Sequence, residues 1–379
     1  MIYLDNSATT RTLPAAAEAA QKYMCESFFN PAAAYSPAVE SERAVNGARA
    51  RLADAMHGSA EEIVFTSGGT ESNNMAIHGA LGAMRGRGQL IMSAVEHPSV
   101  YEVMRGLSSE YDVREAGVDK EGRLDLSSLA EQLTPDTRFV SIMQVNNETG
   151  AINDIPAIYK LVKQEAPGAL VHVDGVQGFL KVPFDARSCD FYTISGHKFH
   201  GPKGVGALYV KKGTRFLGGQ IGGGQERNLR SGTTNTPGIM GMDAALQYYL
   251  ANQETIWQNM RACKMRLAEN LLTLPDVLIN GPAPENGAPH ILNVSFLGVR
   301  GEVLLHALEE KKIYVSTGSA CSAHKKGKNR ILNAMGVTGD RQEGAIRFSF
   351  SLFNTPAEMD EAAAAIAGLL GLLRRFRRR

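Results

Sequence analysis

The sequence predicts an α/β protein, with a large domain built on a mostly parallel sheet and a smaller α+β domain after it. Three observations favour this fold class. Short apolar runs alternate with helical segments over residues 62–210, which is typical of parallel sheets covered by helices. Polar, glycine-rich segments follow several of these runs, at the sheet edge where such folds bind ligands. The length of 379 residues is enough for two domains.

The first part of the chain supplies the predicted sheet. Residues 15–57 have mostly helical periodicity, and a further helix is expected over 73–84. The apolar runs expected to form strands cover residues 62–66, 89–93, 137–143, 169–173, 191–194 and 207–210. Because the carboxyl ends of parallel strands meet at one edge, the segments that follow these runs are expected to lie near one another.

A glycine-rich stretch over residues 218–232 leads into the second part of the chain. A long helical pattern follows over 236–274, and another helix is expected from Glu302. Strands are expected at 291–296, 313–315 and 345–350, and a C-terminal helix contains the apolar run 362–373. We place the domain boundary inside the long helix. The predicted units are a segment that packs with the small domain (1–14), a large cofactor-binding domain (15–253) and a small domain (254–379).

Composition is that of an ordinary soluble protein, with 44% hydrophobic and 21% charged residues and a formal net charge of +1. Bulk charge therefore favours no nucleic-acid partner. The apolar run 362–373 is too short to span a bilayer, and no signal pattern opens the chain, so no membrane partner and a cytoplasmic location are expected.

The chain has four cysteines and no CxxC pair, which indicates neither a metal site nor a disulfide framework. Cys25 and Cys263 lie in helical patterns and Cys189 precedes a strand, so we expect each to be a small buried side chain. The fourth, Cys321, lies in a different kind of segment.

A lysine and an aspartate end two neighbouring predicted strands. Lys198 lies in the segment Ser195-Gly-His-Lys, and Asp174 ends the segment Val171-His-Val-Asp. This pair suits pyridoxal phosphate (PLP): a lysine can form a Schiff base with its aldehyde, and a carboxylate can keep its pyridine nitrogen protonated. A surface lysine after a strand is the simpler interpretation of Lys198 taken alone.

Three further segments at strand ends carry polar groups. Residues 67–72, with Gly69 and Thr70, join a strand to a helix, and such a junction binds anions or is an ordinary capped turn. His97 could stack on a cofactor ring or move protons, or be structural. Asn147 lies in an Asn-Asn-Glu-Thr-Gly turn that suits a ring hydroxyl or a substrate carboxylate, although such turns need no function.

Two residues of the small domain suggest chemistry. Cys321 lies in a polar loop of small residues over 316–329, where nearby His and Lys side chains should favour the thiolate. Arg347 lies inside an apolar strand and therefore needs an anion, either in an internal salt bridge or as a bidentate substrate carboxylate.

Together these segments resemble the PLP-dependent cysteine desulfurases of the class V aminotransferase family, in the branch with a long cysteine loop. The matching segments occur in the family's order and spacing over nearly the whole chain. They are Tyr3–Thr10, Thr66–Ser72, Glu96–His97, Val145–Gly150, His172–Gln177, Ser195–Lys198, Gly222–Arg227, Arg230–Thr233 and Ser316–Cys321. The resemblance implies fold type I of PLP enzymes, with a mostly parallel sheet of the seven-stranded type.

The resemblance also implies a role for each matching residue. Lys198 would bind the cofactor and move the Cα proton, with His97 stacked on the ring and assisting proton transfer. Asp174 would pair with the pyridine nitrogen and Gln177 with the ring hydroxyl. Cys321 would take the substrate sulfur as a persulfide and release alanine. The remaining implied binding residues are Gly69, Thr70, Ser195, His197 and, from the partner subunit, Thr233 for the phosphate, and Asn147 and Arg347 for the substrate carboxylate.

The expected function is therefore removal of sulfur from L-cysteine by a homodimer that passes the sulfur to an acceptor protein. Iron–sulfur cluster assembly is the first expectation for the acceptor, and tRNA thiolation is the second. A selenocysteine lyase is the alternative enzyme. A non-catalytic assembly partner is the alternative from another class, and it predicts loss of the lysine or cysteine, although Lys198 and Cys321 are both present.

Overall fold

A computed structural model describes residues 1–318 and 329–376 of the chain. Its centre is a seven-stranded sheet in the order β2-β8-β7-β6-β5-β3-β4. Only β8 runs antiparallel to its two neighbours, so the sheet is mostly parallel as predicted. The strands are β2 (Ile63–Thr66), β3 (Gln89–Ser93), β4 (Asp112–Ala116), β5 (Thr137–Met143), β6 (Leu170–Asp174), β7 (Phe191–Ser195) and β8 (Gly206–Val210).

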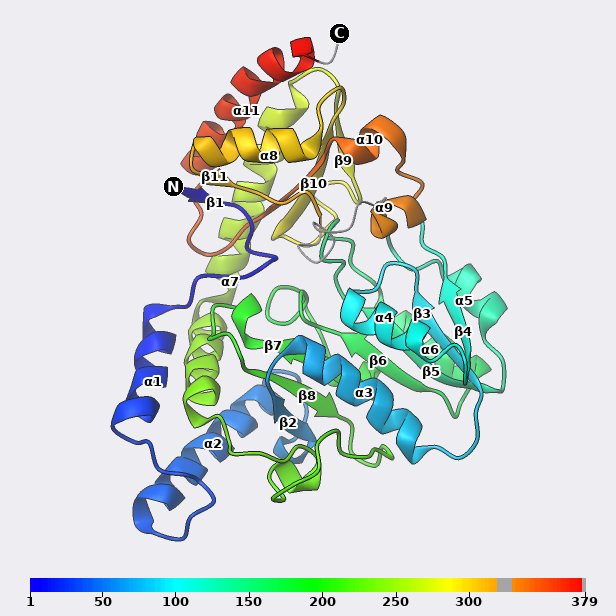
Figure 1. Cartoon of the computed structure of the whole chain (residues 1–379), viewed down its shortest axis with the longest axis vertical. Coiled ribbons are helices and arrows are strands. Elements are labelled where there is room, and N and C mark those ends of the chain that lie inside the picture. Colours follow the sequence, from blue (N-terminus) through cyan, green and yellow to red (C-terminus); the bar gives the residue numbers. More distant parts are fainter. Residues whose placement is uncertain (319–328, 377–379) are drawn as a thin grey trace.

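Helices cover both faces of this sheet, which explains why its inner strands are buried at nearly every position. One face packs under α3 and α4 through a cluster that includes Met75, Met104 and Phe139, and the opposite face joins the main core. The helices of this part are α1 (Pro14–Cys25), α2 (Ser36–Asp54), α3 (Gly69–Ala83), α4 (Pro98–Gly106), α5 (Leu126–Gln132) and α6 (Ile155–Glu165) (Figure 1).

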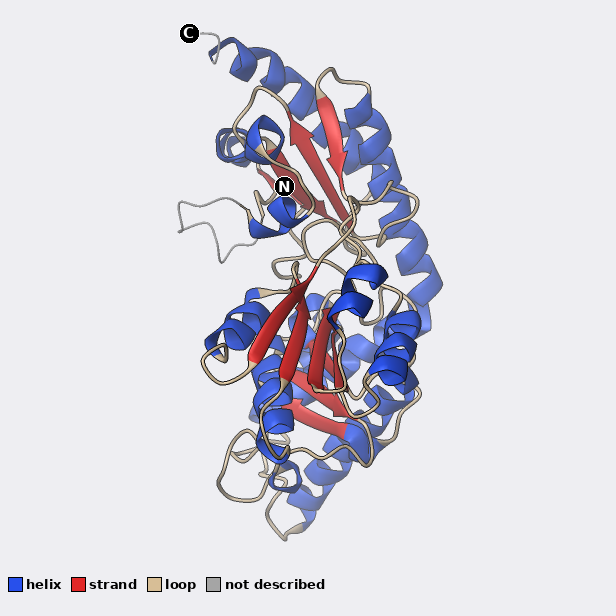
Figure 2. Ribbon diagram, turned by 90° about the vertical axis from the view of Figure 1, so that its right-hand side faces the viewer, coloured by secondary structure: helices blue, strands red, loops and turns tan. Residues whose placement is uncertain are grey.

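A second, smaller layer lies over the carboxyl edge of the large sheet. Figure 2 shows the two sheets one above the other, with helices on both sides of them. The smaller sheet is antiparallel in the order β12-β10-β9, and β1 pairs in parallel with β11 beside it. The remaining elements are β1 (Ile2–Tyr3), β9 (Val277–Asn280), β10 (Ile291–Phe296), β11 (Ile313–Tyr314), β12 (Ala345–Ser349), α8 (Gly301–Glu310), α9 (Arg330–Ala334), α10 (Gly339–Glu343) and α11 (Pro356–Phe376).

The long helix α7 (Thr236–Leu272) joins the two layers (Figure 1). Its backbone leaves helical geometry at Asn252, where φ is −126° and ψ is 15°. The helix contacts α1 and α2 as well as α11 of the small domain. The kink is next to the boundary we predict at residues 253–254, which stays a prediction.

Several elements differ from the sequence-based expectation. Helix α3 begins at Gly69, four residues before the predicted start at Asn73. The prediction missed this first turn because it consists of glycine, threonine, glutamate and serine and has no apolar residue. Strand β4 (Asp112–Ala116) has no counterpart in the prediction. It lies at the sheet edge with a half-exposed, charged sequence, so it lacks the apolar run that marks an inner strand.

The C-terminal helix α11 shows why the apolar run near the end of the chain does not indicate a membrane segment. It buries Met359, Ala362, Ile366 and Leu370, which recur every three or four residues along one face. Within residues 1–318 and 329–376, no helix combines the length and apolar character needed to cross a membrane.

Buried Lys264 should make the stability of this fold depend on pH. Its ammonium donates to the Ala288 carbonyl at 2.9 Å, and burial lowers the pKa of Lys264 to about 8. Above that pH the unfolded chain binds the proton and the folded chain does not, so the contribution of Lys264 to the free energy of unfolding should rise with pH up to about 10. We expect Lys264→Met to remove about 1 kcal/mol of that rise between about pH 7 and pH 9. Urea unfolding of the cofactor-free protein at both pH values checks this, and parallel pH profiles of the two proteins would contradict it.

Candidate active site

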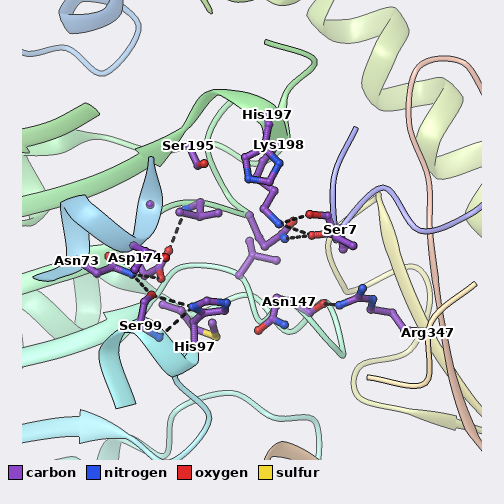
Figure 3. A pocket seen from close by; sticks show the side chains of 17 residues that line it. Ser7, Asn73, His97, Ser99, Asn147, Asp174, Ser195, His197, Lys198 and Arg347 are labelled. Atoms are coloured by element: carbon purple, nitrogen blue, oxygen red, sulfur yellow. Dashed lines mark hydrogen bonds between the residues drawn. The ribbon is translucent and has the colours of Figure 1, made fainter. Parts of the chain in front are cut away.

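A cavity of about 200 Å³ lies between the carboxyl edge of the large sheet and the small domain (Figure 3). It is where the ends of β5, β6 and β7 meet the N-terminus of α3 and strand β12. Ten of the predicted site residues line it. They are Gly69, Thr70, His97, Asn147, Asp174, Gln177, Ser195, His197, Lys198 and Arg347. The remaining two, Thr233 and Cys321, are considered below.

Lys198 ends a 3₁₀ turn (Gly196–Lys198) that directly follows β7. The turn packs tightly, because a Cβ on Gly196 would approach Val205 and Met242 within 3.2 Å. The ammonium of Lys198 donates to the backbone carbonyls of Ser7 at 2.6 Å and Ala8 at 2.8 Å. These contacts hold the amine at the cavity wall, against the N-terminal segment.

Asp174 is the last residue of β6 and pairs with Met143 of β5 and Thr193 of β7. Its carboxyl group is buried and accepts hydrogen bonds from Asn73 Nδ2 at 2.8 Å and from the Val176 amide at 3.0 Å. Two neutral donors therefore fix the carboxyl group at the cavity, where it can also accept a hydrogen bond from a ligand.

His97 is the N-cap of α4, and its Nδ1 accepts from the Ser99 amide at 3.2 Å. The proton of the neutral ring is therefore assigned to Nε2. Burial lowers the pKa of His97, the positive charges of Lys198 and Arg330 lower it further, and Asp174 acts in the opposite direction. A neutral imidazole can stack on an aromatic ring and accept a proton.

The N-terminus of α3 forms one end of the cavity and fits an anion. The first-turn amides of a helix have no partner within it, and the N-cap residue Gly68 has no side chain to satisfy them. Ser195 lies against this turn, because a Cβ on Gly68 would be 3.6 Å from its hydroxyl. His197 lines the same cavity, and burial lowers its pKa to about 4, so its neutral ring has one N–H to donate.

Arg347 and Asn147 lie on the opposite side of the cavity from Asp174 (Figure 3). Arg347 Nη2 forms a salt bridge with Asp5 at 2.7 Å, and Nη1 donates to the Asn147 carbonyl at 3.0 Å. Thus the internal salt bridge considered for Arg347 exists, and the guanidinium also lines the cavity. Among the described residues, Arg347 Nε and Asn147 Oδ1 are buried without a hydrogen-bond partner. Such orphaned buried groups mark a place where a polar ligand fits.

Sequence reasoning missed residues that support the predicted ones. Ser7, Asn73 and Ser99 line the cavity and hold Lys198, Asp174 and His97 respectively. Ser7 belongs to one of the motifs recognised in the sequence, and Ser99 stands two residues after His97. The sequence positions of Ser7 and Ser99 could therefore have indicated their roles. Asn73 contacts a residue 101 positions away, and nothing near it in the sequence indicates that contact.

Thr233 does not line this cavity. Thr233 lines a separate cavity with Ser67, Glu226 and Arg230. Cys321 lies outside the described residues. The strand pairing that leads toward it is visible, because the backbones of Ser316 and Arg347 exchange hydrogen bonds of 2.6 and 3.2 Å.

The prediction for the other cysteines is partly wrong. Cys189 and Cys263 are buried, and burial raises the pKa of both thiols. Cys25, however, is exposed at the end of α1, because the helix turns this position toward solvent. In the described part of the chain, no cluster of three or more His, Cys, Asp or Glu side chains could hold a metal ion.

Comparison with known proteins identifies the family of this chain. The model of the family described as aminotransferase class-V matches residues 2–361. A cysteine desulfurase of Nostoc sp. is 39% identical over 99% of this chain and 94% of its own length. The solved structure of a NifS-like protein superposes with a TM-score of 0.92 at 36% identity, covering 98% of this chain and 100% of its own. The structure of SspA in complex with cysteine gives a TM-score of 0.82 at 29% identity, covering 94% of this chain and 100% of its own.

Proposed function

Because the chain belongs to the class-V aminotransferase family and to its cysteine desulfurases, which use pyridoxal phosphate, we propose that it transfers the sulfur of L-cysteine to Cys321 and releases L-alanine. The observation that carries this proposal is the cavity that brings Lys198, Asp174 and His97 together. PLP supplies an aldehyde that a lysine can bind covalently and a ring that accepts electrons from the substrate.

The residues present fit this cofactor from end to end. Asp174 would accept from the protonated pyridine nitrogen, and His97 would stack on the ring. Gln177 Nε2, which donates to the Ser7 carbonyl at 2.9 Å, would donate to the ring hydroxyl. The open α3 amides suit the phosphate, with Gly69, Thr70, Ser195 and His197 around them.

The other side of the cavity would hold the substrate. Arg347 and Asn147 carry the orphaned polar atoms that suit a carboxylate, and Arg347 supplies the charge. Lys198 would take the Cα proton once its amine is released, and His97 would assist. The thiolate of Cys321 would then attack the substrate sulfur: an S–S bond forms, the C–S bond breaks, and protonation of the remaining carbon skeleton gives alanine.

We infer an iron–sulfur scaffold protein as the acceptor of the persulfide sulfur, on the resemblance of the sequence motifs to the family. Sulfur transfer for tRNA thiolation is the alternative. Incubating the purified protein with candidate acceptors after loading it with ³⁵S-cysteine would distinguish these. Label should move to the scaffold protein, and movement only to a tRNA-thiolation carrier would contradict the first proposal.

The test of the reaction itself is turnover of L-cysteine compared with L-selenocysteine. The purified protein should be yellow from bound PLP, and it should form alanine from cysteine only while it carries PLP. Alanine formation from selenocysteine alone would support the lyase alternative and overturn the desulfurase proposal.

We expect a homodimer in which each cavity is completed by Thr233 of the partner subunit. Two observations support this: Thr233 does not line the cavity of its own chain, and Ile221 in the preceding glycine-rich segment is 99% exposed. Thr233→Asp would place a negative charge beside the phosphate, so this variant and Lys198→Ala should each be inactive as homodimers. A hybrid of the two should regain activity, because one of its sites combines an intact Lys198 with an intact Thr233.

The hybrid also distinguishes a Thr233 that completes the cavity of the partner subunit from a Thr233 that completes the cavity of its own subunit. If Thr233 served its own subunit, no site in the hybrid would be intact and activity would stay absent. Analytical ultracentrifugation of the wild-type protein provides the second measurement. A fully active monomer would overturn the prediction.

A further inference from the structure

Arg330 of the small domain is hydrogen-bonded to the turn that precedes His97. It is the first residue of α9, and its guanidinium donates to the backbone carbonyls of Ala94 and Glu96, just after β3. The same guanidinium stacks over the ring of Tyr101, with its central carbon 3.8 Å from the ring centroid. A planar cation that forms two hydrogen bonds and one stacking contact has little freedom to move.

Apolar packing reinforces this attachment. Val95, between the two bonded carbonyls, is buried in a small cluster with Ile331, Leu332 and Met335 of the α9 region. The cluster is separate from the main core. Helix α9 therefore contacts residues 94–96 through both hydrogen bonds and apolar packing. His97 is the next residue along the chain.

We propose that Arg330 is a positioning residue for His97, which holds the 94–96 turn so that the imidazole stays at the cavity. This inference rests on the proposed function only for the role of His97, since the contacts of Arg330 do not depend on it. Lysine could not replace Arg330, because an ammonium is not a planar fork and cannot stack in the same way.

The charge of Arg330 also acts on the titration of His97. The imidazole faces Asp174 from β6, Lys198 from the turn after β7, Arg330 from α9 and the Ser99 hydroxyl from α4.

Around Arg330 are Tyr101 and the carboxyl groups of Glu96, Glu115 and Glu148. Glu96 is fully buried, and burial raises its pKa well above the usual range. Removal of Arg330 should therefore raise the pKa of His97.

The first experiment follows His97 directly in the cofactor-free protein. The Cε1–H resonance is recorded against pH in ¹³C-histidine-labelled protein and assigned by its loss in His97→Gln. Arg330→Met should move the midpoint to higher pH. Arg341→Met is the matched control, because Arg341 also donates to a carbonyl, that of Ile279, and to Asn280, but within the small domain. The control should leave the His97 midpoint unchanged.

The second experiment follows turnover. The acid limb of kcat/KM, which needs neutral His97, should move to higher pH in Arg330→Met, and kcat should fall about tenfold or more through misplacement of the ring. Arg330→Lys keeps the positive charge but loses the planar guanidinium. The midpoint of the acid limb should therefore stay near that of the wild type, while kcat still falls. If Arg330→Met does not fold, the kcat of Arg330→Lys still tests the inference.

Three results would overturn the inference: an unchanged His97 midpoint in Arg330→Met, the same shift in Arg341→Met, or wild-type kcat in Arg330→Lys. Failure of the proposed function is a distinct result. A protein that does not consume cysteine, yet shows the His97 shift without cofactor, refutes the desulfurase proposal and supports the role of Arg330.

Discussion

Replacing Lys198 with alanine is expected to abolish turnover of L-cysteine, by at least about 10³-fold. The amine of Lys198 is the group at the cavity proposed to bind an aldehyde covalently and then move the Cα proton, and it donates hydrogen bonds to the backbone carbonyls of Ser7 and Ala8. Asp174 and the open α3 amides are untouched, so noncovalent PLP binding should survive. Alanine release and visible absorbance after addition of PLP measure the two effects separately.

Lys203→Ala is the matched control for this variant. Lys203 follows Lys198 by five residues and is exposed, so its removal should leave both absorbance and turnover as in the wild type. Wild-type turnover by Lys198→Ala would refute the assignment of Lys198. Equal loss of turnover in both variants would point to general disruption of the loop.

The sequence was sufficient to predict elements whose burial is complete. The bounds expected for 89–93, 137–143 and 291–296 are those of β3, β5 and β10, because nearly all these positions are buried and apolar residues form most of each strand. Strand β9 was missed for the reason that applies to β4. It is an edge strand with exposed Leu278, so its pattern does not stand out from a loop.

The site was predictable where function follows from position at a strand end. Asp174 ends β6 and Lys198 lies in the turn directly after the adjacent strand β7, and the rule that ligands bind at that edge places them together. The salt-bridge partner of Arg347 could not be predicted from strand ends. Asp5 lies 342 positions away in the sequence, and the pairing of the N-terminal segment with β12 brings it to Arg347. The catalytic and binding roles given to these residues remain predictions that the experiments above test.

Replacing Cys321 with alanine is expected to abolish alanine release while leaving substrate binding intact. Cys321 is the proposed sulfur acceptor, whereas the cofactor and the substrate are proposed to bind to other residues, Lys198, Asp174 and Arg347, which line the cavity. Addition of L-cysteine should therefore still change the visible spectrum of the variant. Neither alanine nor an enzyme persulfide should form.

Mass spectrometry after cysteine addition identifies the thiol that carries the sulfur. A gain of about 32 Da, the mass of one sulfur atom, should map to Cys321 in the wild-type protein. Cys25→Ala is the strictest control, because Cys25 is exposed and therefore accessible to sulfur from solution. Cys189 and Cys263 are buried, and burial raises their thiol pKa, so they should be unreactive in the folded protein. A sulfur adduct on one of these three cysteines in place of Cys321, or near-normal alanine release by Cys321→Ala, would show that the proposed route of the sulfur is wrong.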